Sequence, residues 1–161
     1  MASTATNKQP LLVDRVFHEV QQANTLASGS ATDLNILGTN ESAVLVNCAT
    51  NDGGIIEDLY VISRSADTAY KILIYFSTAS DYLRPAEATY IGSVTSAATL
   101  GTVTHFADLP NVLAPLPNTG TDAQVGALYV PKGKNVWISL QAVTSSGLAT
   151  TPIVGAQGGF Y

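Results

Sequence analysis

Few residues of this chain have the type and spacing that catalysis or metal binding requires. The two histidines, His18 and His105, both fall in runs that predict strands, and neither has a cysteine or carboxylate at a metal-ligand spacing. The adjacent carboxylates Glu57 and Asp58 would point to opposite faces of a strand, a poor geometry for a general acid and base. We therefore expect no catalytic residue, no metal site and no cofactor, and a protein that is not an enzyme.

The single cysteine and the acidic turn residues are better explained by structural roles than by reactivity or ion binding. Cys48 lies in an apolar run without basic neighbours, which predicts an inert buried thiol that cannot form an intramolecular disulfide. Asn51-Asp52-Gly53 and Asp67 could offer oxygens to a calcium ion. Nothing there matches an ordered ion loop, so turn formation accounts for these residues better.

Aromatic side chains are the next candidates, and their chemistry is contact. Trp137 shares a predicted strand face with Ser139 and Gln141, whereas the apolar residues at 136, 138 and 140 face the other way. On that more polar face Trp137 could anchor a partner or stack on a sugar; the alternative is a tryptophan of the core. Phe160 and Tyr161 follow two glycines and either reach a partner or cap this domain's own core.

A proline-rich segment, residues 107–124, supplies the remaining candidates. Its three prolines cannot donate to a sheet ladder, so we expect an extended loop. The loop's apolar residues argue against disorder and either fold back on the core or meet a partner. Together with Trp137, Phe160 and Tyr161, the predicted partner-binding residues are Leu109, Val112, Leu113 and Leu116. The polar residues 1–10 predict a flexible arm that orders on a partner.

The elements that must position these residues are short β-prone runs separated by Gly, Pro, Asn and Asp. The runs are residues 11–20, 43–48, 55–64, 70–77, 89–94, 100–106, 125–130, 135–144 and 152–161. Turn residues predict that 55–64 pairs with 70–77 as a hairpin, and 125–130 with 135–144. The first pair is apolar on both faces, so we expect it at the centre of a sheet covered on both sides. Only residues 13–25 could also be read as a helix.

These runs predict one all-β domain over residues 11–161, a jelly-roll-like antiparallel β-sandwich of eight or nine strands. Its 161 residues are enough to bury a core without disulfides or metal. Charged residues are only 12% of the chain, about half the usual share. Such a surface suits contact with other proteins, and we expect a homo-oligomer.

The charge balance argues against several partners. With seven basic residues and a net charge of −5, direct binding to nucleic acid or to an anionic membrane is not expected. No apolar run is long enough for a membrane helix, and the start lacks the apolar region of a signal peptide. We therefore expect synthesis in a cytoplasm.

Four stretches carry a resemblance to a known kind of protein: residues 6–10 (TNKQP), 72–76 (ILIYF), 129–140 (YVPKGKNVWISL) and 154–161 (VGAQGGFY). In this layout the chain resembles small β-sandwich structural proteins of tailed bacteriophages, in particular head decoration (cement) proteins. The proline-rich loop departs from the leaner members of that group. The resemblance implies a virion protein, made in the host bacterial cytoplasm, that stabilises the head. It would bind the major capsid protein at capsomer junctions on the outer surface, commonly as a homotrimer, and it has no catalytic residues to carry over.

Two other functions remain open. One is a tail, fibre or baseplate component of the same kind of particle. The other is a carbohydrate-binding β-sandwich module, in which Trp137 would stack on the sugar.

Overall fold

The structure is a computed structural model, and it describes residues 14–23, 42–80, 83, 87–106, 127–141 and 151–161. The predicted arm, residues 1–10, and the predicted loop, residues 107–124, lie outside the described residues. The contacts predicted for Leu109, Val112, Leu113 and Leu116 therefore stay predictions.

All regular elements among the described residues are strands, which confirms the all-β prediction. They are β1 (Arg15–Gln22), β2 (Ser42–Val46), β3 (Gly54–Ile62), β4 (Lys71–Ser77), β5 (Thr89–Thr95), β6 (Val103–His105), β7 (Leu128–Val130), β8 (Asn135–Gln141) and β9 (Ile153–Phe160). Each overlaps one of the nine predicted runs. The stretch that could also be read as a helix contains β1, an extended strand.

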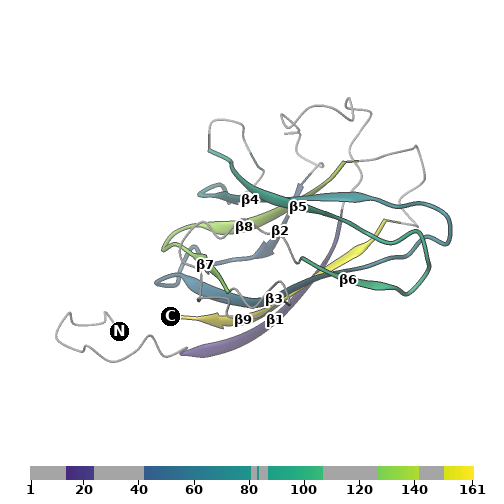
Figure 1. The fold of residues 1–161 in the computed structure, drawn as a ribbon. Coiled ribbons are helices and arrows are strands. Elements are labelled where there is room, and N and C mark those ends of the chain that lie inside the picture. The colour runs from purple at the N-terminus through teal and green to yellow at the C-terminus, as the bar shows by residue number, and fades with distance from the viewer. Residues whose placement is uncertain (1–13, 24–41, 81–82, 84–86, 107–126, 142–150) are drawn as a thin grey trace, which may run out of the picture.

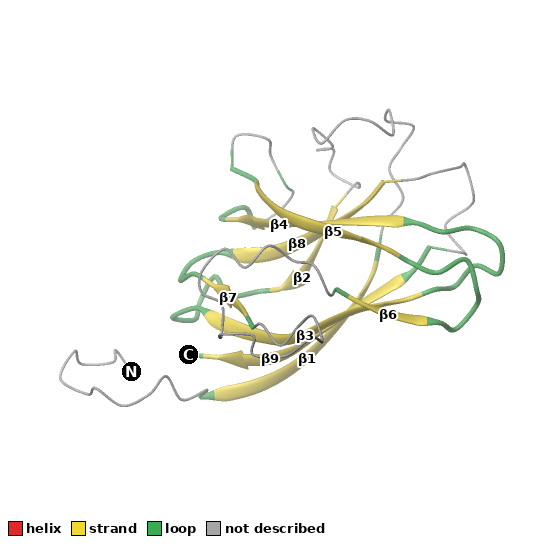
Figure 2. Cartoon of the chain, in the orientation of Figure 1, coloured by secondary structure: helices red, strands yellow, loops and turns green. Residues whose placement is uncertain are grey.

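The strands form two antiparallel sheets that pack face to face (Figures 1 and 2). Sheet A has the order β1-β9-β3-β6, with β7 also paired to β3, and sheet B has the order β2-β8-β4-β5. The pairs β1·β9, β2·β8, β3·β6 and β4·β5 are nested, as in one long hairpin rolled into a sandwich. This is the strand order of a jelly roll with β7 added, and it confirms the predicted fold.

Both predicted hairpins are wrong. β3 lies in sheet A and β4 in sheet B, and the same is true of β7 and β8. The connecting turns form where expected, since Lys134 N–H donates to the Pro131 carbonyl (3.1 Å). Each turn carries the chain from one sheet to the other, because burying both apolar faces requires partners that are distant in sequence.

The core lies between the sheets, and sheet B also has an apolar outer face. Ile72 and Ile74 of β4 belong to the main core, whereas Leu73 and Tyr75 belong to a second buried cluster on the opposite face. The prediction that residues 70–77 are covered on both sides is therefore confirmed. β3 is central in sheet A, with Ile56, Leu59 and Val61 in the main core, but its outer face is only half-buried.

Candidate functional site

Trp137 lies on the predicted face of its strand but is not exposed there. It points away from the main core, in which Val136, Ile138 and Leu140 of the same strand are buried. Only 2% of Trp137 is accessible, because Leu73, Tyr75, Ala79 and Leu83 pack with it in the second cluster. Its ring therefore offers neither a sugar-stacking face nor an anchor for a partner in this structure, contrary to the predicted contact role.

Four buried polar atoms on this face of sheet B have no hydrogen-bond partner among the described residues: Ser42 Oγ, Tyr75 OH, Trp137 Nε1 and Ser139 Oγ. The strand register explains why they are neighbours. Ser42 is directly opposite Ser139, and Tyr75 directly opposite Trp137, on one face of sheet B. Burial is the main cause that raises the pKa of the Tyr75 phenol; the nearby Ser139 hydroxyl acts in the opposite direction. A buried polar group that is left without a partner destabilises a fold by about 1–3 kcal/mol.

Phe160 serves the core. It is 4% exposed and belongs to the main cluster between the sheets. Its ring lies 4.6 Å from the ring of Phe17, and the Arg15 guanidinium lies over it at 4.9 Å. Tyr161 is half-buried, and its backbone closes the end of the sandwich: its N–H donates to Gly53 O (3.1 Å), and its carbonyl accepts from Asp52 N–H (3.2 Å). Of the two readings predicted for Phe160, the structure supports the cap on its own core.

The single cysteine and the acidic turn residues have structural roles. Burial raises the pKa of the Cys48 thiol to about 11, so the thiol is neutral and unreactive near neutral pH. Asp52 pairs with Lys132, and that hydrogen bond and charge lower the pKa of the Asp52 carboxyl. Asp67 accepts hydrogen bonds from Ser65 Oγ (3.0 Å) and Thr68 Oγ1 (3.3 Å) within its own turn. These contacts are the turn chemistry that the sequence indicated.

The exposed surface that stands out is β1, which lies at one end of sheet A (Figure 1). Val16 is 81% exposed and Val20 52%, and His18 between them is also exposed. These three side chains point away from the core, while Phe17 packs against it. The sequence pattern placed Val16 and Val20 on one face, but nothing local indicated that this face would be open.

The backbone of β1 is open as well, at the edge of sheet A. Ala23 N–H donates to the Pro152 carbonyl (3.0 Å), and the register of β1 with β9 is regular. From Arg15 to Ala23 the odd-numbered residues therefore hydrogen-bond to β9; before β1 begins, Asp14 N–H also donates to the Phe160 carbonyl (2.8 Å). The N–H and C=O groups of Val16, His18 and Val20 point to the opposite edge, because successive residues of a strand alternate in direction. Among the described strands, none pairs with β1 at that edge.

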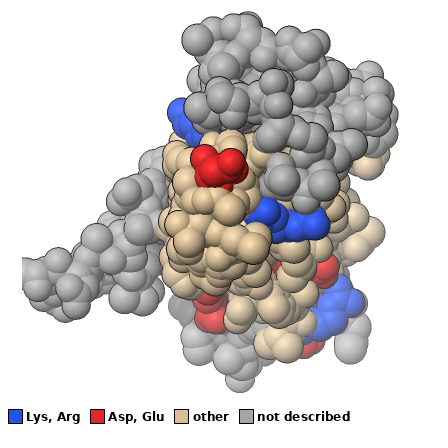
Figure 3. Space-filling model, turned by 90° about the vertical axis from the view of Figure 1, so that its right-hand side faces the viewer, with Lys and Arg blue, Asp and Glu red and all other residues tan. Residues whose placement is uncertain are grey.

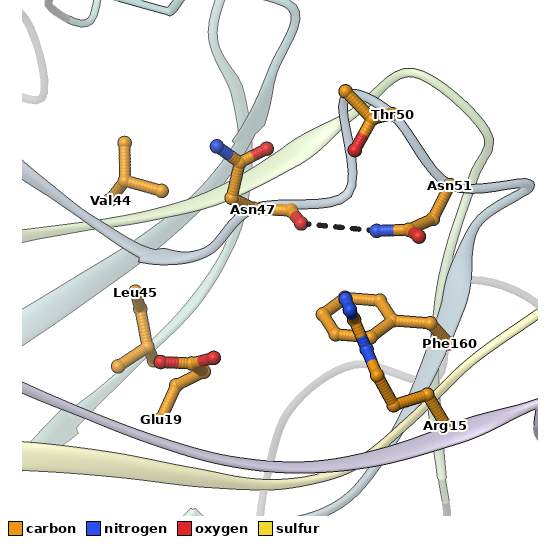
Figure 4. Close-up of a pocket in the computed structure, with 8 residues that line it drawn as sticks. All are labelled: Arg15, Glu19, Val44, Leu45, Asn47, Thr50, Asn51 and Phe160. Carbon is orange, nitrogen blue, oxygen red and sulfur yellow. Dashed lines mark hydrogen bonds between the residues drawn. The ribbon is translucent and has the colours of Figure 1, made fainter.

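A groove runs beside β1, between the edges of the two sheets (Figure 4). Its volume is about 360 Å³, and Phe160, with its ring beside the Arg15 side chain, is one of the residues that line it. The other lining residues are Arg15 and Glu19 from β1, Val44 and Leu45 from β2, and Asn47, Thr50 and Asn51 from the turn that follows. Asn51 Nδ2 donates to the Asn47 carbonyl (3.5 Å). The groove thus presents both signs of charge and several amides, a set suited to binding.

Both histidines lie on the outer face of sheet A. His18 Nε2 is 2.6 Å from Tyr60 OH, and His105 Nδ1 is 2.8 Å from Asp58 Oδ1. Tyr60 stands between the two imidazoles, with ring centroids 6.1 and 6.2 Å away. The absence of a side chain at Gly155 makes the row possible, since a Cβ there would lie 2.2 Å from the Tyr60 ring. The sequence could not predict this row, because it depends on strands that pair across the whole chain.

Charge contributes little to the surface. On the face shown in Figure 3, acidic and basic side chains form small separate groups in a largely uncharged surface. Among the described residues, no three or more His, Cys, Asp or Glu side chains are grouped so that they could hold a metal ion. The described part of the chain also contains no helix that is long and apolar enough to span a membrane.

The geometry therefore singles out three adjoining features: the open edge of β1, the groove beside it, and the outer face of sheet A. All three are suited to contact with another molecule. In comparisons with protein-family models, with curated proteins and with solved structures, no match to this chain was found.

Proposed function

We propose that this protein is a virion structural protein that binds the outer surface of a capsid and stabilises the head, and that it is not an enzyme. The observation that carries the proposal is the outer face of sheet A. Three of the exposed large apolar side chains of the described residues belong to it, Val16, Val20 and Val103. They lie on β1 and β6, at the two edges of sheet A, so a partner that covered this face would contact all three.

The fold and the composition agree with the proposal. Jelly rolls occur in viral capsid proteins and in lectins, so the fold allows the function without selecting it. The choice of a tailed-phage head rests on the sequence resemblance. A low share of charged residues, 12%, leaves a surface that can lie close to a capsid lattice at little desolvation cost. The threefold association implied by the resemblance remains a prediction.

The exposed surfaces also bear on the two alternative functions, a tail component and a carbohydrate-binding module. A tail, fibre or baseplate protein could use the outer face of sheet A in the same way, so location on the particle must be measured. The carbohydrate-binding alternative depended on an exposed Trp137, which is 2% accessible. The burial of Trp137 therefore removes the reason for the carbohydrate-binding alternative.

The test is co-sedimentation of the purified protein with heads and, separately, with tails of the phage whose genome encodes it. Binding to heads supports the proposal, and binding only to tails supports the alternative. Val103→Glu should weaken head binding on the order of tenfold, because it places a charge on the proposed contact face. Leu100→Glu is the matched control, because Leu100 is 66% exposed but lies in the turn before β6. No binding to either fraction, or an origin outside a phage genome, would overturn the proposal.

A further inference from the structure

The open edge of β1 is a surface whose partner can be argued from its own residues. We propose that β1 pairs with β1 of a second copy of this chain, antiparallel and about a twofold axis at His18, so that sheet A continues across both copies. This inference concerns self-association, and it stands whether or not the protein binds a capsid. It proposes a twofold contact in place of the threefold association that the resemblance implies.

The backbone already has the required arrangement. An unpaired edge strand offers a row of N–H and C=O groups to another strand, and natural proteins usually cover or shorten such edges. Here the strand is eight residues long, and its central side chains are exposed. Val16, His18 and Val20 direct their backbone groups to that edge. An identical strand run antiparallel is complementary to it, because a twofold contact uses the same surface on both copies.

The side chains select the register. The backbone groups that face the edge belong to even-numbered residues, so the twofold axis must bring even-numbered residues of the two copies opposite each other. Near the centre of the strand, axes at Phe17, His18 and Glu19 do so. An axis at Glu19 would place the two Glu19 carboxylates directly opposite each other. An axis at Phe17 would place Val20 opposite the second copy's Asp14, whose N–H already donates to the Phe160 carbonyl (2.8 Å).

An axis at His18 avoids both conflicts. It pairs the whole strand and places Val16 opposite the second copy's Val20, and Val20 opposite the second copy's Val16. These are the most exposed apolar side chains of β1, at 81% and 52%, so the pairing shields part of each from water.

The charges on the groove side of β1 agree with that register. Arg15 and Glu19 both line the groove and are both exposed. About the His18 axis, Arg15 is opposite the second copy's Gln21 and diagonal to the second copy's Glu19, within reach of long side chains. Charges that guard an edge work by repelling an identical strand. A strand that carries both signs at this spacing attracts its antiparallel copy instead, which favours a second copy over an unrelated strand.

The first experiment measures mass and links the proposed axis covalently. Sedimentation equilibrium of the purified protein at micromolar concentration should give twice the chain mass of 16.7 kDa. Across a hydrogen-bonded antiparallel pair the Cα atoms are about 5.5 Å apart, a distance that a disulfide can span. His18→Cys should therefore form a disulfide-linked dimer under mild oxidation. The control, Val103→Cys, places an exposed cysteine on β6 and should not, and Cys48 is buried in both proteins.

The second experiment removes one donor of the open edge. Val20→Pro deletes an N–H that points away from β9, so the internal sheet keeps its bonds and edge strands tolerate proline. The variant should keep a β-type circular dichroism spectrum and raise the dimer dissociation constant at least about tenfold. A monomer or trimer as the main species of the parent would overturn the proposal. So would cross-linking of His18→Cys no faster than Val103→Cys, a result that does not depend on how Val20→Pro folds. Neither outcome affects the capsid test, which relies on Val103.

Discussion

Replacing Phe160 by alanine tests whether this residue belongs to the core or to a contact surface. A Phe160 that reached a partner could be removed with the fold intact and only binding lost. In the structure its ring is 4% exposed and lies between the sheets. Phe160→Ala should therefore act first on stability.

The magnitude follows from what the ring contacts. Truncating a buried phenylalanine costs about 3–5 kcal/mol, because transfer free energy is lost and a cavity remains. Part of this is the ring pair with Phe17 at 4.6 Å, an arrangement that contributes about 0.5–1.5 kcal/mol beyond its buried area. The exposed Arg15 guanidinium over the ring adds about 0.5–1 kcal/mol. Core burial is the larger effect, so we expect a loss of about 4 kcal/mol for Phe160→Ala and at most about 1 kcal/mol for Arg15→Ala.

Urea denaturation followed by circular dichroism or tryptophan fluorescence measures both variants. A loss of this size should lower the melting temperature by roughly 8–16 °C for a domain of this length. Arg15→Ala is the matched control, because it removes only the exposed partner of the ring. If Phe160→Ala lost less than about 1 kcal/mol, or no more than Arg15→Ala, the placement of Phe160 in the core would be refuted.

Further outcomes are expected at two glycines, two serines and the single cysteine. Gly158→Ala should destabilise the fold by at least about 3 kcal/mol in the same urea assay, because its Cβ would lie 1.9 Å from the Ile55 carbonyl oxygen. Gly155→Ala should cost only about 1 kcal/mol, since it meets the end of a side chain that can turn away; equal losses would contradict this reasoning. Ser42→Ala should be neutral or stabilising because it removes a buried hydroxyl that has no partner among the described residues, whereas Ser63→Ala, which removes a hydrogen bond to the Ser65 carbonyl (3.1 Å), should lose about 1 kcal/mol. The pKa of Cys48 rises from 9.0 to about 11, so at pH 8 a thiol reagent should label the native protein at least about 100-fold more slowly than the protein in urea, and rapid native labelling would count against the buried site.

Local pattern was sufficient for the elements and their faces. Alternation with a period of two separated Ile72 and Ile74 from Leu73 and Tyr75, and it placed Trp137 opposite the main-core residues of its own strand. These assignments hold because side chains of a strand alternate whatever the strand pairs with. The same reasoning predicted that Cys48 is buried and that the acidic residues form turns.

Tertiary structure alone decided which strands are neighbours and which faces are covered. The turn between β7 and β8 reverses the chain in either case, so its residues could not show that it leads from one sheet to the other. Trp137 is buried because a second cluster covers its face of sheet B, whereas Val16 and Val20 are exposed because no described segment covers the outer face of sheet A at β1. The row of His18, Tyr60 and His105 depends on β1, β9, β3 and β6 lying side by side. A sequence pattern records which side chains share a face, but the coverage of that face depends on contacts between segments far apart in the chain.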